Sequence, residues 1–143
     1  MPHVIAILED NADRVAVMRA KLADGLSQHE HFVTDDPPTL IDFLERRWAD
    51  ILLVSLDHDL HERPDHSTTL TGLQAAQYLA GRDPAFPVLM HTTNRVEGRQ
   101  MRVALKDAGW HVRWVHPFDD TNWIGSDWYP TLERALRKFA RTD

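Results

Sequence analysis

Short apolar runs alternate along the chain with segments in which apolar residues recur every three to four positions. Each run is too short for a helix, and its continuous apolar character is typical of a strand buried on both faces of a parallel sheet. The strongest run covers residues 51–56, and four others cover residues 3–8, 32–34, 87–90 and 112–115. The chain therefore predicts five buried strands.

A helix is predicted after each of these strands. In the first, which begins at Asp10 or Asn11 and ends at Gly25, Met18 and Leu22 lie on the buried face, and Arg14 points away from it. The second helix begins at Pro37, and its inner face carries Leu40, Ile41, Leu44 and Trp48. The third helix begins near Thr71, the fourth ends at Gly109, and the fifth covers residues 132–139. Strands that alternate with helices indicate an α/β domain with a doubly wound parallel sheet.

Composition narrows the class of protein. The 143 residues, 43% hydrophobic and 27% charged, suit one folded domain over residues 1–143. The absence of cysteine excludes disulfides, thiol nucleophiles and iron–sulfur clusters. A net charge of −6 argues against general nucleic-acid binding, although a local site for RNA or a nucleotide stays open. Without a basic leader or an apolar stretch of ~18 residues, we expect a cytoplasmic protein that does not enter membranes.

Polar side chains gather where the predicted strands end. Ligands of doubly wound sheets bind at the carboxyl ends of the strands, so these side chains are expected to form one site. Five of the nine histidines lie there or in the polar stretch beside it, including His61 and His66. The residues at the strand ends are Glu9, Asp10, Asp57, His58, Asp59, His91, Thr92, Thr93, Asn94 and His116.

The order of these residues resembles the receiver domain of two-component response regulators. The resemblance covers nearly the whole chain and implies a flavodoxin-like sheet of five βα units. It places an acidic pair at Glu9-Asp10 and the phosphoacceptor at Asp57. It also places the receiver hydroxyl at Thr92 or Thr93.

Three departures from the receiver pattern are informative. His116 stands where receivers have a lysine, and the stretch from Asp57 to Gly72 is longer and rich in histidine and acid. His58 and His91 have been added beside the acids. Together these features resemble a receiver variant proposed to process cyclic phosphates, and the loss of the lysine weakens a signalling role.

The resemblance also implies a divalent metal site. Glu9, Asp10 and Asp57 would hold Mg²⁺, with the backbone carbonyl of Asp59 as a further ligand. Mn²⁺ or Zn²⁺ are alternatives, because imidazole favours transition metals. In an extended segment His58 would point away from both neighbouring acids, so we do not expect all three to bind one ion. The simpler interpretation is that the acids only cap strand and helix ends.

Cyclic-phosphate hydrolysis needs a base to activate water and an acid to protonate the leaving oxygen. His58 and His91 can serve both roles near neutral pH, and His116 is a candidate contact to the phosphate. A histidine that merely bonds to a neighbouring carboxylate is the alternative in each case. Hydrogen bonds to the phosphate are expected from Thr92, Thr93 and Asn94, unless these residues cap the following helix.

Two functions follow as hypotheses. The first is a metal-dependent phosphoester hydrolase that processes a cyclic phosphate on a small ligand, a nucleotide or an RNA end. The second is an atypical stand-alone receiver, phosphorylated at Asp57, that acts through a protein partner. Trp123 and Trp128 could stack on a nucleobase, although packing of the last helix is the favoured interpretation.

Overall fold

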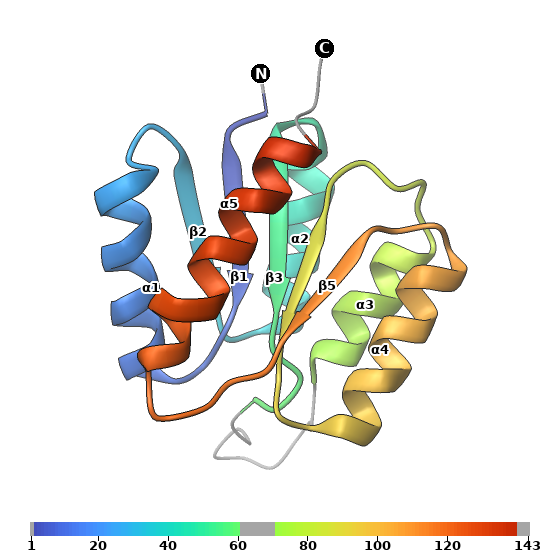
Figure 1. The fold of residues 1–143 in the computed structure, drawn as a ribbon. Helices are drawn as coiled ribbons and strands as arrows, with labels where there is room; N and C mark the ends of the chain where they lie inside the picture. Colours follow the sequence, from blue (N-terminus) through green and yellow to red (C-terminus); the bar gives the residue numbers. More distant parts are fainter. Residues whose placement is uncertain (1, 61–70, 140–143) are drawn as a thin grey trace.

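The computed structural model describes residues 2–60 and 71–139 of the chain. Five parallel strands form one sheet in the order β2-β1-β3-β4-β5 (Figure 1). This is the order of flavodoxin-like doubly wound folds, so the predicted fold class is confirmed. The strands are β1 (Val4–Leu8), β2 (Glu30–Thr34), β3 (Ile51–Leu56), β4 (Val88–His91) and β5 (Val112–Val115).

Helices cover both faces of this sheet. Helices α1 and α5 pack on one face, and α2, α3 and α4 pack on the other (Figure 1). The helices are α1 (Ala12–Gly25), α2 (Pro37–Arg47), α3 (Gly72–Ala80), α4 (Arg95–Asp107) and α5 (Tyr129–Lys138). A 3-10 turn η1 (Trp48–Asp50) precedes β3, and a π-helical turn η2 (Ile124–Trp128) leads into α5.

Strand β1 shows why the apolar runs are continuous. All five of its residues are buried, with Ile5 and Ile7 packed among α1 and α5 and with the alternate residues packed toward α2, α3 and α4. Side chains of a strand alternate between the two faces, so a sheet covered on both sides needs apolar residues at every position. The core therefore lies in two layers, one on each side of the sheet.

Two details of the second helix differ from the prediction. Helix α2 ends at Arg47, so Trp48 belongs to η1 and packs on Phe86 instead of extending the helix. Phe43 is buried and stacks on Phe32, whereas Ile41 is only half-buried. The helical period was correct, but aromatic stacking across to β2 selects the residue that is buried.

The start of α3 packs directly on the end of β3. The Thr71 side chain caps the helix, and the Gly72 N–H donates to the backbone oxygen of His58 at 3.0 Å. A Cβ at Gly72 would lie 1.9 Å from the backbone oxygen of Asp57, so only glycine permits this approach. Gly72 thereby fixes the backbone that presents Asp57 and His58.

Trp123 and Trp128 are completely buried in the layer beneath α1 and α5. Their indole N–H groups donate to the Asp120 carbonyl and to the Ser55 hydroxyl. Packing of the last helix is therefore confirmed as their role, and stacking of a nucleobase on either ring is excluded. No helix within residues 2–60 and 71–139 is long and apolar enough to cross a membrane.

Candidate functional site

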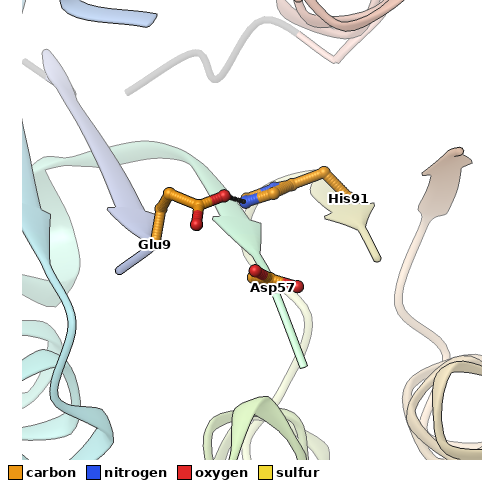
Figure 2. Close-up of side chains that lie close together, drawn as sticks. All are labelled: Glu9, Asp57 and His91. Atoms are coloured by element: carbon orange, nitrogen blue, oxygen red, sulfur yellow. Dashed lines mark ion pairs between the residues drawn. The ribbon is translucent and has the colours of Figure 1, made fainter. Parts of the chain in front are cut away.

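Three strand ends bring Glu9, Asp57 and His91 together at the carboxyl edge of the sheet. One ligand atom of each lies within 4.8 Å of the others, and all three side chains are buried. Figure 2 shows the Glu9 carboxylate and the His91 ring pointing at each other from β1 and β4, with Asp57 on the β3 side between them. We call these three residues the inner cluster.

Glu9 is held by its own backbone neighbours. Its Oε2 accepts hydrogen bonds from the backbone N–H groups of Asp10 and Asn11, each at 3.0 Å. Its Oε1 lies 3.2 Å from His91 Nε2. Glu9 is thus fixed through one oxygen and presents the other to the centre of the cluster.

The His91 ring is held from behind by Ser55 of β3. Ser55 Oγ lies 2.7 Å from His91 Nδ1, and the Trp128 indole N–H donates to the same Oγ at 3.0 Å. An indole N–H can only donate, so the hydroxyl proton of Ser55 is free to point at Nδ1. Ser55 therefore holds Nδ1, and Nε2 faces Glu9.

The position of the Arg14 side chain differs from the prediction. It was expected to point away from the buried face of the first helix, but its Nη1 lies 3.6 Å from Glu9 Oε1 and 3.7 Å from Asp57 Oδ2. Its guanidinium also lies over the Trp123 ring at 5.3 Å. Arg14 is in the first turn of α1, above the carboxyl edge, and its long side chain reaches back to both acids.

Burial and charge give the two inner carboxyls opposite pKa shifts. Burial alone would raise the pKa of Glu9, but its contacts with His91, the Asn11 N–H and Arg14 outweigh burial and hold it at about 2. For Asp57, burial is the dominant cause and raises the pKa to about 7, with Glu9 adding to the rise and His91 and Arg14 opposing it. The cluster therefore holds one firmly ionised carboxylate beside one that resists ionisation.

His58 lies in a second group, away from the inner cluster. Its Nδ1 is 2.7 Å from Asp59 Oδ1, and its Nε2 is 3.9 Å from Glu97 Oε2 of α4. The Asn94 side chain donates to the same Asp59 oxygen at 3.2 Å. We call His58, Asp59, Asn94 and Glu97 the outer cluster. The backbone bends at His58 instead of staying extended, and the ring contacts Asp59, which was not expected.

A pocket of about 290 Å³ opens beside the inner cluster. The residues that line it are Asp10, Asn11, Arg14, Asp57, Asp59, Leu60 and Thr93. Two residues predicted as metal ligands, Asp10 and Asp59, therefore lie along the pocket, where they can face a ligand.

The segment after β4 caps α4. The Asn94 Oδ1 accepts from the Glu97 N–H at 2.9 Å, and the Thr92 hydroxyl accepts from the Asn94 N–H at 3.1 Å. Thr92 is buried, whereas Thr93 is exposed. The capping interpretation thus describes Thr92 and Asn94, and Thr93 is the residue of the three that lines the pocket.

His116 is exposed and lies apart from the inner cluster. Its ring stacks on Trp114 of β5, with ring centroids 4.6 Å apart. The Trp114 indole N–H donates to the Thr92 carbonyl at 2.9 Å, which ties this pair to the segment that follows β4. His61 and His66 lie outside the described residues.

The inner cluster fits a divalent ion. Glu9 Oε1 and His91 Nε2 are buried, close together and without a well-aligned hydrogen bond, so an ion would satisfy both. Among the described residues, these three side chains form the group of at least three acids and histidines whose ligand atoms are close enough to share one ion. One imidazole and two carboxylates suit Mn²⁺ or Zn²⁺ in addition to Mg²⁺.

Sequence comparison identifies a matching family. The family of cyclic-phosphate processing receiver domains matches residues 5–107. No curated protein matches the chain. The matched range includes the inner and outer clusters.

Solved structures with the same fold are response-regulator receiver domains. The response regulator domain of Thermotoga maritima CheB has a TM-score of 0.69 at 14% identity, covering 100% of this chain and 99% of the other. The signal receiver domain of a putative Luxo repressor from Vibrio parahaemolyticus has a TM-score of 0.65 at 16% identity, with 100% of both chains covered. The phosphorylated cyanobacterial phytochrome response regulator RcpA reaches 0.65 at 17% identity, covering 100% of this chain and 97% of the other. At such identities these likenesses establish the fold.

Proposed function

Because this chain belongs to the family of cyclic-phosphate processing receiver domains, we propose that it is a metal-dependent hydrolase of a cyclic phosphodiester. The observation that carries the proposal is the inner cluster, in which Glu9, Asp57 and His91 present three ligand atoms within 4.8 Å. The histidine is the important member, because an imidazole adds a transition-metal ligand to the carboxylates of the site. The presence of His91 among the carboxylates therefore supports a catalytic metal site on the receiver fold.

Each cluster has its own task in this proposal. A divalent ion at Glu9, Asp57 and His91 would polarise the phosphate and lower the pKa of the attacking water. His91 is thereby assigned to the metal instead of proton transfer, since it is completely buried and both ring nitrogens already face Ser55 and Glu9.

His58 is the proposed general acid. Asp59 Oδ1 lies 2.7 Å from its Nδ1, a contact that orients the ring. The water oxygen bonds to phosphorus and releases its proton to solvent. The ring P–O bond breaks, and the departing oxygen takes the proton from His58, which leaves a phosphate monoester.

Pocket residues would bind the substrate. Arg14 lies within 4 Å of both inner carboxylates and faces the same pocket, so it can move toward a phosphate oxygen when an ion takes its place between the acids. Thr93 lines the pocket and can donate a hydrogen bond. Asp10 at the pocket can bind an ion through water.

The test is incubation of the metal-free protein with 2′,3′- and 3′,5′-cyclic phosphates and with Mg²⁺, Mn²⁺ or Zn²⁺ in turn. Formation of the monoester is followed by ³¹P NMR. We expect turnover with at least one metal and loss of turnover on chelation, with Glu9→Gln as the matched inactive variant. No monoester from any substrate–metal pair would contradict the proposal.

A signalling receiver is the second candidate, and the position of Asp57 supports it. Asp57 follows β3 in a fold whose structural neighbours include a phosphorylated response regulator. In this case phosphoramidate should add one phosphoryl group to Asp57, and the group should also be added in His58→Ala. Stable labelling without turnover of any cyclic phosphate would favour a receiver that acts through a protein partner.

A further inference from the structure

The basic side chains of this acidic protein are concentrated on one side. Helix α4, strand β5 and helix α5 carry eight of the 16 basic residues but three of the 22 acidic ones. Within residues 2–60 and 71–139 none of these eight forms an ion pair, whereas Arg14, Arg46, Arg47 and Arg82 do. The eight are Arg95, Arg99, Arg102, Lys106, Arg113, Arg134, Arg137 and Lys138.

A groove runs through this side, between the edge strand β5 and α5. Its volume is about 310 Å³, and we call it the basic groove. Three cations line it without an acidic side chain. The residues that carry the argument are His111, Arg113, Trp114, Arg134, Lys138 and Phe139.

The environment of His111 independently reports the positive potential. Burial lowers its pKa first, and Arg113, Lys138 and Lys106 lower it further. An uncompensated positive potential at a concave surface attracts anions. It also repels a second copy of the same face, so a symmetric dimer through this groove is disfavoured.

Flat rings accompany the cations. Phe139 packs against His111 with ring centroids 3.9 Å apart, and Lys138 lies 5.5 Å from the Phe139 ring centre. Trp114 is half-buried, with His116 stacked on it and the Arg102 guanidinium 5.2 Å from its ring centre. Cations beside partly exposed rings are a pattern of single-stranded nucleic-acid sites, in which phosphates contact the charges and bases stack on the rings.

Contacts through Trp114 link the basic groove to the carboxyl edge of the sheet. Trp114 lines the basic groove and donates its indole N–H to the Thr92 carbonyl, and the next residue, Thr93, lines the pocket beside the inner cluster. In Figure 1, β5 is the outermost strand on the side of α4, and its carboxyl end reaches the edge where β3 and β4 also end. An extended ligand that lies along β5 would therefore have one end close to the inner and outer clusters.

We propose that the basic groove binds a single-stranded nucleic acid, and that the cyclic phosphate processed at the edge is the terminal group of that strand. The second half of this inference rests on the proposed function, but the binding itself does not. A local site of this kind agrees with the net charge of −6, which opposes only general coating of nucleic acids.

Binding is tested by fluorescence anisotropy with a single-stranded RNA of about ten nucleotides, a length within the range of known strand-binding sites. Arg113→Ala, Arg134→Ala and Lys138→Ala should each weaken binding several-fold and lower the slope of log K against log salt by about one. Arg46→Ala is the matched control, because it removes one exposed cation from α2, where Arg46 pairs with Asp42. Its affinity should stay close to that of the unchanged protein.

Two results would overturn the proposal. One is an equal loss of affinity in Arg46→Ala and the groove variants, which would mean that net charge alone matters. The other is equally tight binding of a polyglutamate of similar length, which would mean that the groove takes any polyanion.

Turnover separates this inference from the proposed function. In the triple groove variant, KM for an RNA ending in a 2′,3′-cyclic phosphate should rise at least tenfold, while kcat/KM for the cyclic mononucleotide is unchanged. If the groove substitutions leave the turnover of both substrates unchanged, this inference is contradicted and the proposed function is not. If neither substrate is turned over, the proposed function fails, and the anisotropy result still decides whether the groove binds RNA.

Discussion

The inner and outer clusters begin at adjacent residues, Asp57 and His58, yet they differ in burial and partners. Asp57 points into a closed group with Glu9 and His91, whose side chains are fully buried. His58 contacts Asp59 and approaches Glu97, whose side chains are 61% and 38% exposed. His58 is itself buried, with a side chain only 7% exposed, so the two clusters differ in the exposure of the partners that surround Asp57 and His58. In our proposal the inner cluster would hold an ion, and the outer cluster would supply a proton.

The largest effect is expected from His91→Ala. It removes a proposed metal ligand, so metal affinity and turnover should fall together, with turnover reduced toward ~10⁴-fold, the upper end of what one catalytic group supplies. Calorimetry with Mn²⁺ and Zn²⁺ and the ³¹P assay measure the two quantities. Normal metal affinity in this variant would break the distinction between the clusters.

His58→Ala should separate turnover from metal binding. The outer cluster contributes a proton in our proposal, so turnover should fall ~10²–10³-fold while metal affinity stays within twofold. His3→Ala, which removes a half-exposed histidine near the opposite edge, is the matched control. A parallel loss of metal in His58→Ala would mean that the two clusters form one site.

Asp57→Asn should stabilise the metal-free protein at high pH. The folded pKa of Asp57 is raised from 3.8 to about 7, so the stability linked to its protonated form is present below about pH 4 and is lost as the pH rises through 7. The free energy of unfolding of Asp57→Asn should therefore exceed that of the unchanged protein by about 1–3 kcal/mol near pH 8. Near pH 4 the difference should vanish.

Urea unfolding in the presence of EDTA measures this pH dependence. Asp59→Asn is the control from the outer cluster, because the same substitution there removes a carboxylate that is 61% exposed. A similar gain in both variants would contradict a special environment at Asp57.

The smallest effect is expected from Ser55→Ala. Losing the hydroxyl leaves the Trp128 N–H and His91 Nδ1 without their shared partner, which should cost about 1–2 kcal/mol of stability. Turnover should fall about tenfold, because Ser55 orients a proposed ligand without touching the substrate. Thermal unfolding and the ³¹P assay check both quantities. Unchanged turnover would show that His91 does not need the hydrogen bond with Ser55 to keep its orientation.

Much of the fold was predictable from local patterns. The run at residues 51–56 is a strand because every side chain in a doubly covered sheet meets a helix or a neighbouring strand. The meeting of Glu9, Asp57 and His91 was also predictable, because each residue closes or follows a parallel strand. The chemical roles of these residues stay predictions.

The misses share a physical cause. Arg14 is on the polar side of α1, and the helical period alone does not show that a long side chain can reach back to two carboxylates. Ser55 lies inside an apolar strand, and its partner His91 is 36 residues away in the chain. Glu97 belongs to the first turn of α4, where an acid normally only complements the helix end. An acid at the start of that helix was the available signal, because the turn lies at the carboxyl edge.

The indole hydrogen bonds make the tryptophan N–H groups natural NMR probes of separate regions of the protein. Each of four tryptophan N–H groups donates to a different region: Trp110 to the Leu79 carbonyl, Trp114 to the Thr92 carbonyl, Trp123 to the Asp120 carbonyl and Trp128 to the Ser55 hydroxyl. In a ¹H–¹⁵N spectrum the resonance of Trp128 would report on His91, that of Trp114 on the basic groove, and that of Trp110 on a remote core. Metal and RNA titrations would then be read separately in one sample, with no added label.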